Sequence, residues 1–141
     1  MPELPVGFHT RTFWQDQLFD YQTLRSTGRA LRFALLDGEA VVGAINYDQI
    51  IRGPFQACYL GYSIDSGYQG KGFMKEALSK TIDHVVDELG LNRIMANYEP
   101  SNHRSAKLLK SLGFEREGYA RKYLKLNGVW KDHVLTSYIQ D

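Results

Sequence analysis

The sequence predicts a single mixed α/β domain in which helices flank a mostly antiparallel sheet. Two hairpin signals, Asp37-Gly38 and Asn127-Gly128, each lie between runs of strand-forming residues, and hairpins join antiparallel strands. Between them, one helical pattern separates strands expected over Tyr59–Ile64 and Arg93–Tyr98, and a helical crossover joins parallel strands. The length of 141 residues suits one hydrophobic core, so we expect one domain over residues 1–141.

A helix and three strands are expected first along the chain. The helix is predicted over Phe13–Ser26, where apolar residues track one side; they are Trp14, Leu18, Tyr21 and Leu24. Leu31–Leu36 and Ala40–Ile51 are rich in strand formers, and Gly53-Pro54 separates them from a third strand over Ala57–Ile64.

Two further helices and three strands are expected after Tyr68. The first helix carries apolar residues three and four positions apart and closes at Gly90; they are Met74, Ala77, Leu78, Ile82, Val85, Val86 and Leu89. Pro100 ends the strand over Arg93–Tyr98. Ser101 or Asn102 can cap the second helix.

The second helix is expected to end at Leu112, where Gly113-Phe114 fits a Schellman motif with Phe114 folded back on Leu109. A final hairpin then follows over Tyr119–Leu126 and Val129–Ile139.

Composition indicates a globular protein, with 43% apolar and 23% charged residues. No apolar run approaches the roughly 20 residues that span a bilayer, and the N-terminus has no signal-peptide pattern, so we expect a cytoplasmic protein without a membrane partner. Cys58 is the single cysteine and cannot form an internal disulfide. The histidines lack zinc-site spacing, so no metal is expected; they are His9, His84, His103 and His133.

Positive charge is concentrated in the second half of the chain. The formal net charge is +1, yet Arg104 to Lys131 holds eight Lys or Arg against Glu115 and Glu117. This imbalance favours a small polyanionic ligand, because dedicated nucleic-acid binders carry a more basic total. A solvated basic face is the plain alternative, and ribosome contact is a lesser one.

The segment Gln69-Gly70-Lys71-Gly72 is the most informative motif, because it opens directly into a helix that follows a strand. The amides of a first helical turn and the positive end of the helix dipole favour phosphate, and glycines let a ligand approach the backbone. An ordinary turn is the alternative for a lone Gly-x-Gly. A Walker loop would need Ser or Thr after Gly-Lys, and the dinucleotide fingerprint would need glycine in place of Lys75.

Together, Gln69–Gly72 and Asn102-x-x-Ser105 at the heads of two helices, followed by SLGFEREGY, resemble the GNAT acetyltransferases. The resemblance runs from about Arg32 to Ile139 and is strongest to the branch that acetylates the N-terminal alanine of a ribosomal protein. It implies acetyl-CoA as the cofactor and a protein N-terminus as the acceptor, without a need for nucleic acid.

The resemblance also implies where acetyl-CoA would bind. The pyrophosphate would meet the backbone from Gln69 to Met74, and the pantetheine arm would lie between strands that part at Tyr62 and Asn97, with Asn102 bonding to it. The residues implied as cofactor-binding are Tyr62, Ser63, Ile64, Gln69, Gly70, Lys71, Gly72, Phe73, Met74, Asn97, Asn102 and Ser105.

For catalysis, the resemblance places Ser105 near the thioester sulfur, where it could protonate the leaving thiolate. Its spacing agrees, since Ser105 shares a helix face with Leu108, Leu109 and Leu112. Many relatives carry a glutamate base where Tyr59 stands, so Tyr59, Tyr98 or a water chain are the candidates for the base. A strong base is not essential, because an α-amine has a pKa of about 8.

The family begins with a strand and a helix ahead of the segment matched by Phe13–Ser26, and only about ten residues precede that segment here. We therefore expect a sheet without the usual first strand and helix, whose exposed edge favours self-association, as a monomer or homodimer. Acetylation of a small-molecule amine and non-catalytic binding of acyl-CoA are the alternative functions.

Overall fold

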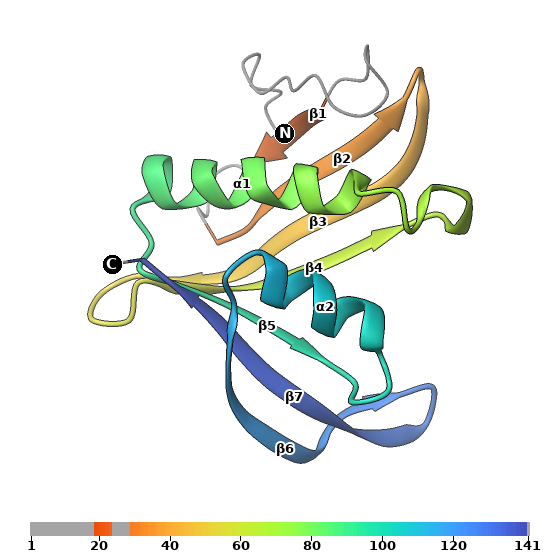
Figure 1. The fold of residues 1–141 in the computed structure, drawn as a ribbon. Helices are drawn as coiled ribbons and strands as arrows, with labels where there is room; N and C mark the ends of the chain where they lie inside the picture. Colours follow the sequence, from red (N-terminus) through yellow and green to blue (C-terminus); the bar gives the residue numbers. More distant parts are fainter. Residues whose placement is uncertain (1–18, 24–28, 141) are drawn as a thin grey trace.

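The computed structural model describes residues 19–23 and 29–140, which form one seven-stranded sheet and two α-helices (Figure 1). The strands are β1 (Phe19–Thr23), β2 (Leu31–Asp37), β3 (Ala40–Ile51), β4 (Ala57–Ile64), β5 (Arg93–Tyr98), β6 (Glu115–Leu126) and β7 (Val129–Ile139). The helices are α1 (Phe73–Leu89) and α2 (His103–Ser111), and a short 3-10 helix, η1 (Ser66–Tyr68), follows β4. The strand order is β1-β2-β3-β4-β5-β7-β6, and only β4 and β5 pair in parallel. This confirms the predicted mixed, mostly antiparallel sheet with flanking helices.

The prediction of a helix over Phe13–Ser26 is wrong for residues 19–23, the part of that segment that the structure describes. Phe19–Thr23 is a strand at the edge of the sheet, paired antiparallel with β2 from Phe19↔Leu35 to Thr23↔Leu31. The rest of the predicted helix lies outside the described residues. The helical spacing of apolar residues misled the prediction, because Phe, Tyr and Thr also favour strands and the open edge of β2 supplies backbone partners.

The core lies between the sheet and the helices, as Figure 1 shows for α1 across the strands. The predicted apolar stripe of α1 is confirmed, and its buried residues are Phe73, Met74, Ala77, Leu78, Thr81, Ile82 and Val85. Thr81 is polar, and its hydroxyl is 2.8 Å from the Tyr47 hydroxyl on β3, so both buried groups are satisfied. Neither α1 nor α2, the helices of the described chain, is long and apolar enough to cross a membrane.

The close of α2 follows the predicted Schellman motif. The Phe114 amide donates to the Leu109 carbonyl at 3.0 Å, and the Gly113 amide donates to the Lys110 carbonyl at 3.1 Å. Phe114 and Leu109 both belong to the core. β6 then begins at Glu115, four residues before the predicted Tyr119, because Glu115 and Arg116 already pair with β7.

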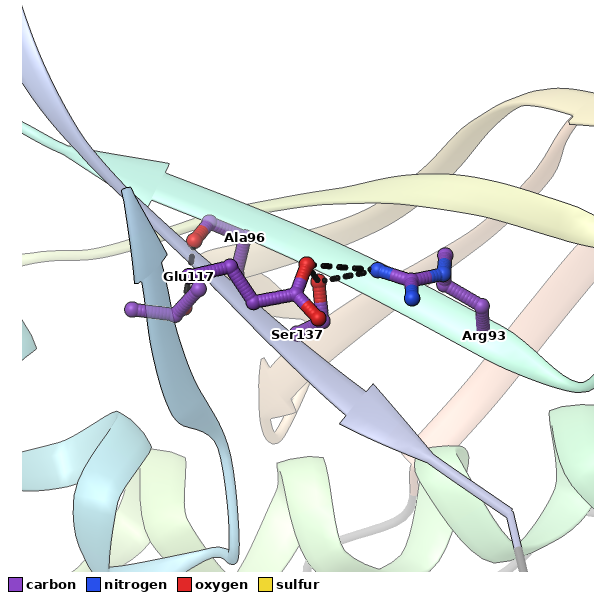
Figure 2. Close-up of polar contacts among 5 residues, drawn as sticks. Arg93, Ala96, Glu117 and Ser137 are labelled. Atoms are coloured by element: carbon purple, nitrogen blue, oxygen red, sulfur yellow. Dashed lines mark hydrogen bonds and ion pairs between the residues drawn. The ribbon is translucent and has the colours of Figure 1, made fainter. Parts of the chain in front are cut away.

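A polar cluster of Arg93, Glu117 and Ser137 ties three strands together (Figure 2). Arg93 Nη1 on β5 donates to Glu117 Oε1 at 2.6 Å and to Ser137 Oγ at 2.9 Å. Ser137 Oγ on β7 donates to the same Glu117 oxygen at 2.8 Å. Glu117 is left out of the β6–β7 register by a bulge between Arg116 and Gly118, which lets its side chain reach this cluster.

Glu117→Gln is expected to lower the unfolding temperature by roughly 2–4 °C at neutral pH. Hydrogen bonds from Arg93 and then Ser137 hold the pKa of Glu117 below its ordinary value. A lowered pKa in the folded state stabilises the fold above the unfolded pKa of about 4.3, and this contribution is lost as pH falls through the folded pKa. The unfolding temperatures of wild type and variant should therefore converge in acid, once the pH falls below the folded-state pKa of Glu117.

Glu115→Gln is the matched control, because Glu115 is an exposed carboxylate on the same strand. An equal effect of the two substitutions, or a Glu117→Gln difference that persists in acid, would contradict a stabilising role for the cluster.

Candidate active site

The glycine loop before α1 has the geometry of an anion-binding site. Gly70 and Gly72 have φ angles of +76° and +83°, in the left-handed region that side chains disfavour. Gly72 is the N-cap of α1 and has no side-chain cap, and the first bond of the helix runs from the Glu76 amide to the Gly72 carbonyl at 3.1 Å. A Cβ at either glycine would meet no atom of the described residues within 4 Å. The space above the loop is therefore open to a ligand.

A cavity of about 270 Å³ lies over this loop, and we call it the loop cavity. The end of β4, the loop, and the first turns of α1 and α2 form its walls. The predicted site residues that line it are Tyr62, Ser63, Ile64, Gln69, Gly70, Gly72, Phe73, Met74, Asn102 and Ser105. Two residues predicted to bind the cofactor, Lys71 and Asn97, do not line this cavity.

Beside the loop cavity, β4 and β5 part from each other, as the resemblance implied. Their parallel pairing covers three register positions and ends at Tyr59↔Met95. Beyond that point β4 stays paired with β3, and β5 stays paired with β7. The backbone groups that face the gap between the parted strands can therefore serve a ligand that lies between them.

A second cavity of about 240 Å³ fills this gap, and we call it the splay cavity. It is lined by Leu60, Gly61, Tyr62, Asn97, Tyr98, Glu99, Asn102, Ser105 and His133. Tyr62, Asn102 and Ser105 line both cavities, so the two cavities adjoin at these side chains.

Ser105 stands at this junction because Asn102 caps α2. The Asn102 side chain accepts a hydrogen bond from the Ser105 amide at 3.1 Å, which starts the helix at His103. The Ser105 hydroxyl lies 2.9 Å from the Tyr62 hydroxyl on β4. Burial raises the pKa of Tyr62, so its phenol stays protonated at neutral pH and can donate to Ser105 Oγ. The pair can therefore supply a proton at the junction.

Gln69 is held in place between α2 and β4. Its amide Nε2 donates to the Ile64 carbonyl at 3.2 Å, and Arg104 Nη1 donates to its Oε1. Arg104 and Lys75 also bring positive charge to the loop cavity. Four residues that line the loop cavity were not predicted from the sequence; they are Tyr68, Lys75, Arg104 and Leu108. The signal for Arg104 was its place in the basic half of the chain, one position before Ser105.

The two tyrosines predicted as candidate bases lie in different places. Tyr98 lines the splay cavity, whereas Tyr59 lies outside both cavities. Tyr59 instead interacts with the Tyr123 hydroxyl, which also accepts a hydrogen bond from Asn97 Nδ2 at 3.3 Å. The structure thus brings Tyr98 and Asn97 to the cavity that holds Ser105 and keeps Tyr59 apart from it.

Comparison with known proteins agrees with this architecture. The model of the acetyltransferase (GNAT) domain family matches residues 8–115. The chain belongs to the GNAT acetyltransferase family. It is 47% identical over 126 residues to the ribosomal protein uS5-alanine N-acetyltransferase of Escherichia coli, and this alignment covers 88% of this chain and 65% of that relative. It is 35% identical over 134 residues to the probable N-acetyltransferase YjcK of Bacillus subtilis, across 94% of this chain and 74% of that relative.

Solved structures give the same result for this GNAT chain. The ribosomal-protein-S5-alanine acetyltransferase from Vibrio fischeri superposes with a TM-score of 0.78 at 49% identity, over 79% of this chain and 62% of that one. RimJ of Mycobacterium smegmatis in complex with CoA-disulfide superposes with a TM-score of 0.76 at 31% identity. This alignment covers 79% of this chain and 54% of that one. The chain thus spans less than two thirds of the length of these three relatives, the Escherichia coli enzyme included.

Proposed function

We propose that the chain is an N-acetyltransferase that moves an acetyl group from acetyl-CoA to the N-terminal amine of a protein, with a ribosomal protein as the acceptor. The observation that carries the proposal is the junction of the two cavities, where the Ser105 hydroxyl lies between an anion-binding loop and a pair of parted strands. The activities in the names of the relatives from Escherichia coli and Vibrio fischeri support the same reaction and acceptor.

The residues of the loop cavity fit acetyl-CoA. The open backbone at Gly70 and Gly72 and the N-terminus of α1 suit a pyrophosphate, and Lys75 and Arg104 add positive charge. Between the parted strands, main-chain groups of β4 and β5 can bond to an extended amide-containing arm. Acetyl-CoA supplies an activated acetyl thioester to this site.

The side chains at the junction would then protonate the leaving group. Ser105 holds a hydroxyl proton that a departing thiolate can take, and the protonated Tyr62 phenol stands behind it as a donor. Alignment of the amine and the acetyl carbon in one groove contributes further to the rate, because it removes the entropy cost of their encounter.

Thiol release tests the proposed reaction directly. The protein is incubated with acetyl-CoA and a peptide that begins with alanine, and the free thiol is followed over time. Release that requires the peptide supports the proposal. Release only with small amines would identify a small-molecule acetyltransferase, and calorimetric binding of acetyl-CoA without release would identify a non-catalytic acyl-CoA-binding protein.

The proposal includes three further expectations. One catalytic domain extends over residues 1–141, it acts in the cytoplasm without nucleic acid, and it is a monomer or homodimer. Size-exclusion chromatography with light scattering, with and without acetyl-CoA, tests the oligomeric state.

Tyr62→Phe is expected to lower kcat by about 3- to 10-fold, because it removes the donor that supports Ser105 Oγ and leaves the aromatic ring in place. The affinity for acetyl-CoA should stay within about twofold, since the hydroxyl bonds to Ser105 and not to the glycine loop. Steady-state kinetics and calorimetry measure the two effects.

Tyr138→Phe is the control for this substitution, because Tyr138 packs on Phe114 and lines neither cavity. If Tyr62→Phe and Tyr138→Phe turn over at the same rate, the Tyr62 hydroxyl has no part in catalysis.

A further inference from the structure

His133 lies in the wall of the splay cavity, although the sequence suggested no role for it. The residue is on β7, it is 5% exposed, and it shares the cavity with Ser105, Asn97 and Tyr98. Its ring lies 5.5 Å from the Tyr123 ring, between centroids, at an interplanar angle of 51°. The imidazole is therefore buried and held beside the place where the acetyl transfer would occur.

The hydrogen bond of His133 determines which ring nitrogen can accept a proton. Nδ1 lies 3.2 Å from the Lys131 carbonyl oxygen. A carbonyl oxygen only accepts hydrogen bonds, so Nδ1 must carry the hydrogen of this contact. In the neutral imidazole, Nε2 is then the unprotonated nitrogen and the acceptor.

The neighbours of His133 on β6 and β7 hold its ring in position. Asp132 accepts hydrogen bonds from the Lys122 amide at 2.9 Å and from the Tyr119 hydroxyl at 2.7 Å. Lys122 has a φ angle of +48° and sits in a bulge between Ala120 and Leu124. Because Asp132 fixes this bulge, it sets the position of Tyr123, which follows Lys122 and lies against His133.

Other ionisable groups around the cavity are poorly suited to accept a proton near neutral pH. Burial is the main cause that raises the pKa of Tyr62 and of Tyr123, so both phenols stay protonated. Tyr98 also presents a phenol hydroxyl, which carries its own proton and can donate it in a hydrogen bond. Glu99 carries a carboxylate that faces Lys131 Nζ at 3.9 Å, and hydrogen bonds from Lys122 and Tyr119 lower the pKa of Asp132. Among the described residues that line the splay cavity, His133 is the histidine, and its neutral imidazole offers an unprotonated nitrogen that can accept a proton.

We propose that His133 accepts the proton of the attacking amine, an inference that rests on the proposed acetyltransferase function. The amine nitrogen forms a bond to the acetyl carbon, and the carbon–sulfur bond breaks with its electron pair on sulfur. Before the attack, His133 Nε2 takes the proton that charges the α-amine at neutral pH and releases it to solvent. As the new bond forms, the next amine proton passes to His133 Nε2, and the thiolate takes the Ser105 proton. The proton on His133 then returns through solvent to Ser105, so the products are an amide and a thiol and both side chains are restored.

His133→Gln is the decisive variant, because glutamine keeps a polar side chain but its amide cannot take a proton near neutral pH. At about pH 7, kcat/KM for an alanine-initiated peptide should fall at least about tenfold. The deficit should shrink toward about pH 9, where an α-amine with a pKa of about 8 is already uncharged. His133→Ala should regain activity when imidazole is added, and calorimetric affinity of both variants for acetyl-CoA should stay within about twofold of wild type.

His84→Gln is the matched control, since His84 lies on α1 outside both cavities, with its ring near Phe33. It should keep wild-type turnover and the wild-type pH profile. A loss in His133→Gln that is equal at all pH values, without rescue by imidazole in His133→Ala, would show a structural role and overturn the inference. Wild-type turnover in His133→Gln would overturn it as well.

A wild-type protein that binds acetyl-CoA and releases no thiol would instead overturn the proposed function. In that case the ring resonances of His133, assigned in NMR spectra by their loss in His133→Gln, provide the separate test. Addition of the alanine-initiated peptide should shift them, and unchanged resonances would show that no amine reaches this histidine.

Discussion

Replacing Gly72 with valine is expected to weaken acetyl-CoA binding by about 10- to 100-fold. Gly72 has a φ angle of +83° and caps α1 at the floor of the loop cavity. A branched side chain would occupy the open space above the loop and strain the backbone that presents the first helical amides. Loss of one hydrogen bond to a charged phosphate costs about 1.5–3 kcal/mol, and 1.4 kcal/mol is tenfold in affinity. Isothermal titration calorimetry measures the change.

Gly90→Val separates this effect from simple strain. Gly90 ends the same helix with a φ angle of +67° and also has open space beside it, but it does not line the loop cavity. Both variants should lose stability, by about 1–2 kcal/mol, whereas only Gly72→Val should lose affinity. Equal affinities of the two variants for acetyl-CoA would rule out the loop as the phosphate site.

Ser105→Ala is expected to reduce kcat by about 10- to 100-fold while acetyl-CoA affinity changes by less than about threefold. The hydroxyl lies at the junction of the two cavities and bonds to Tyr62, so its loss removes the proton donor nearest to the proposed leaving group. The backbone amide of residue 105 still bonds to Asn102, so α2 should keep its capped start. Single-turnover kinetics and calorimetry together separate the chemical step from binding.

Ser111→Ala is the matched control on the same helix. Ser111 is exposed, and its hydroxyl bonds to the Leu108 carbonyl within α2. It should leave kcat unchanged. A Ser105→Ala enzyme with the wild-type rate would remove Ser105 as the acid, and parallel losses in the two variants would point to a general effect on α2.

Features that depend on neighbouring residues were predicted correctly from the sequence. The apolar stripe of α1, the turn at Gly113-Phe114 and the hairpin between β6 and β7 all involve contacts within a few residues. Local spacing and turn chemistry decide such contacts. The glycine loop belongs to the same group, since β4, the short η1, the two glycines and α1 follow one another within a few residues.

Features that depend on distant segments were predicted less well. Phe19–Thr23 became a strand because β2 offered it a paired edge, and its own spacing of apolar residues favoured a helix. Tyr59, predicted as a candidate base, lies outside the cavities, because it is on the part of β4 that still pairs with β5, at Tyr59↔Met95, before the two strands part.

By itself, the amino-acid sequence determined most local elements, the glycine loop before α1 and, through the resemblance, the family and most residues that line the loop cavity. Only the tertiary structure decided that β7 lies between β5 and β6, which brings His133 to the gap that holds Ser105. The physical reason is that strand order depends on backbone pairing and packing between segments far apart in the chain. Side-chain periodicity within one segment carries no information about which strand will be its neighbour.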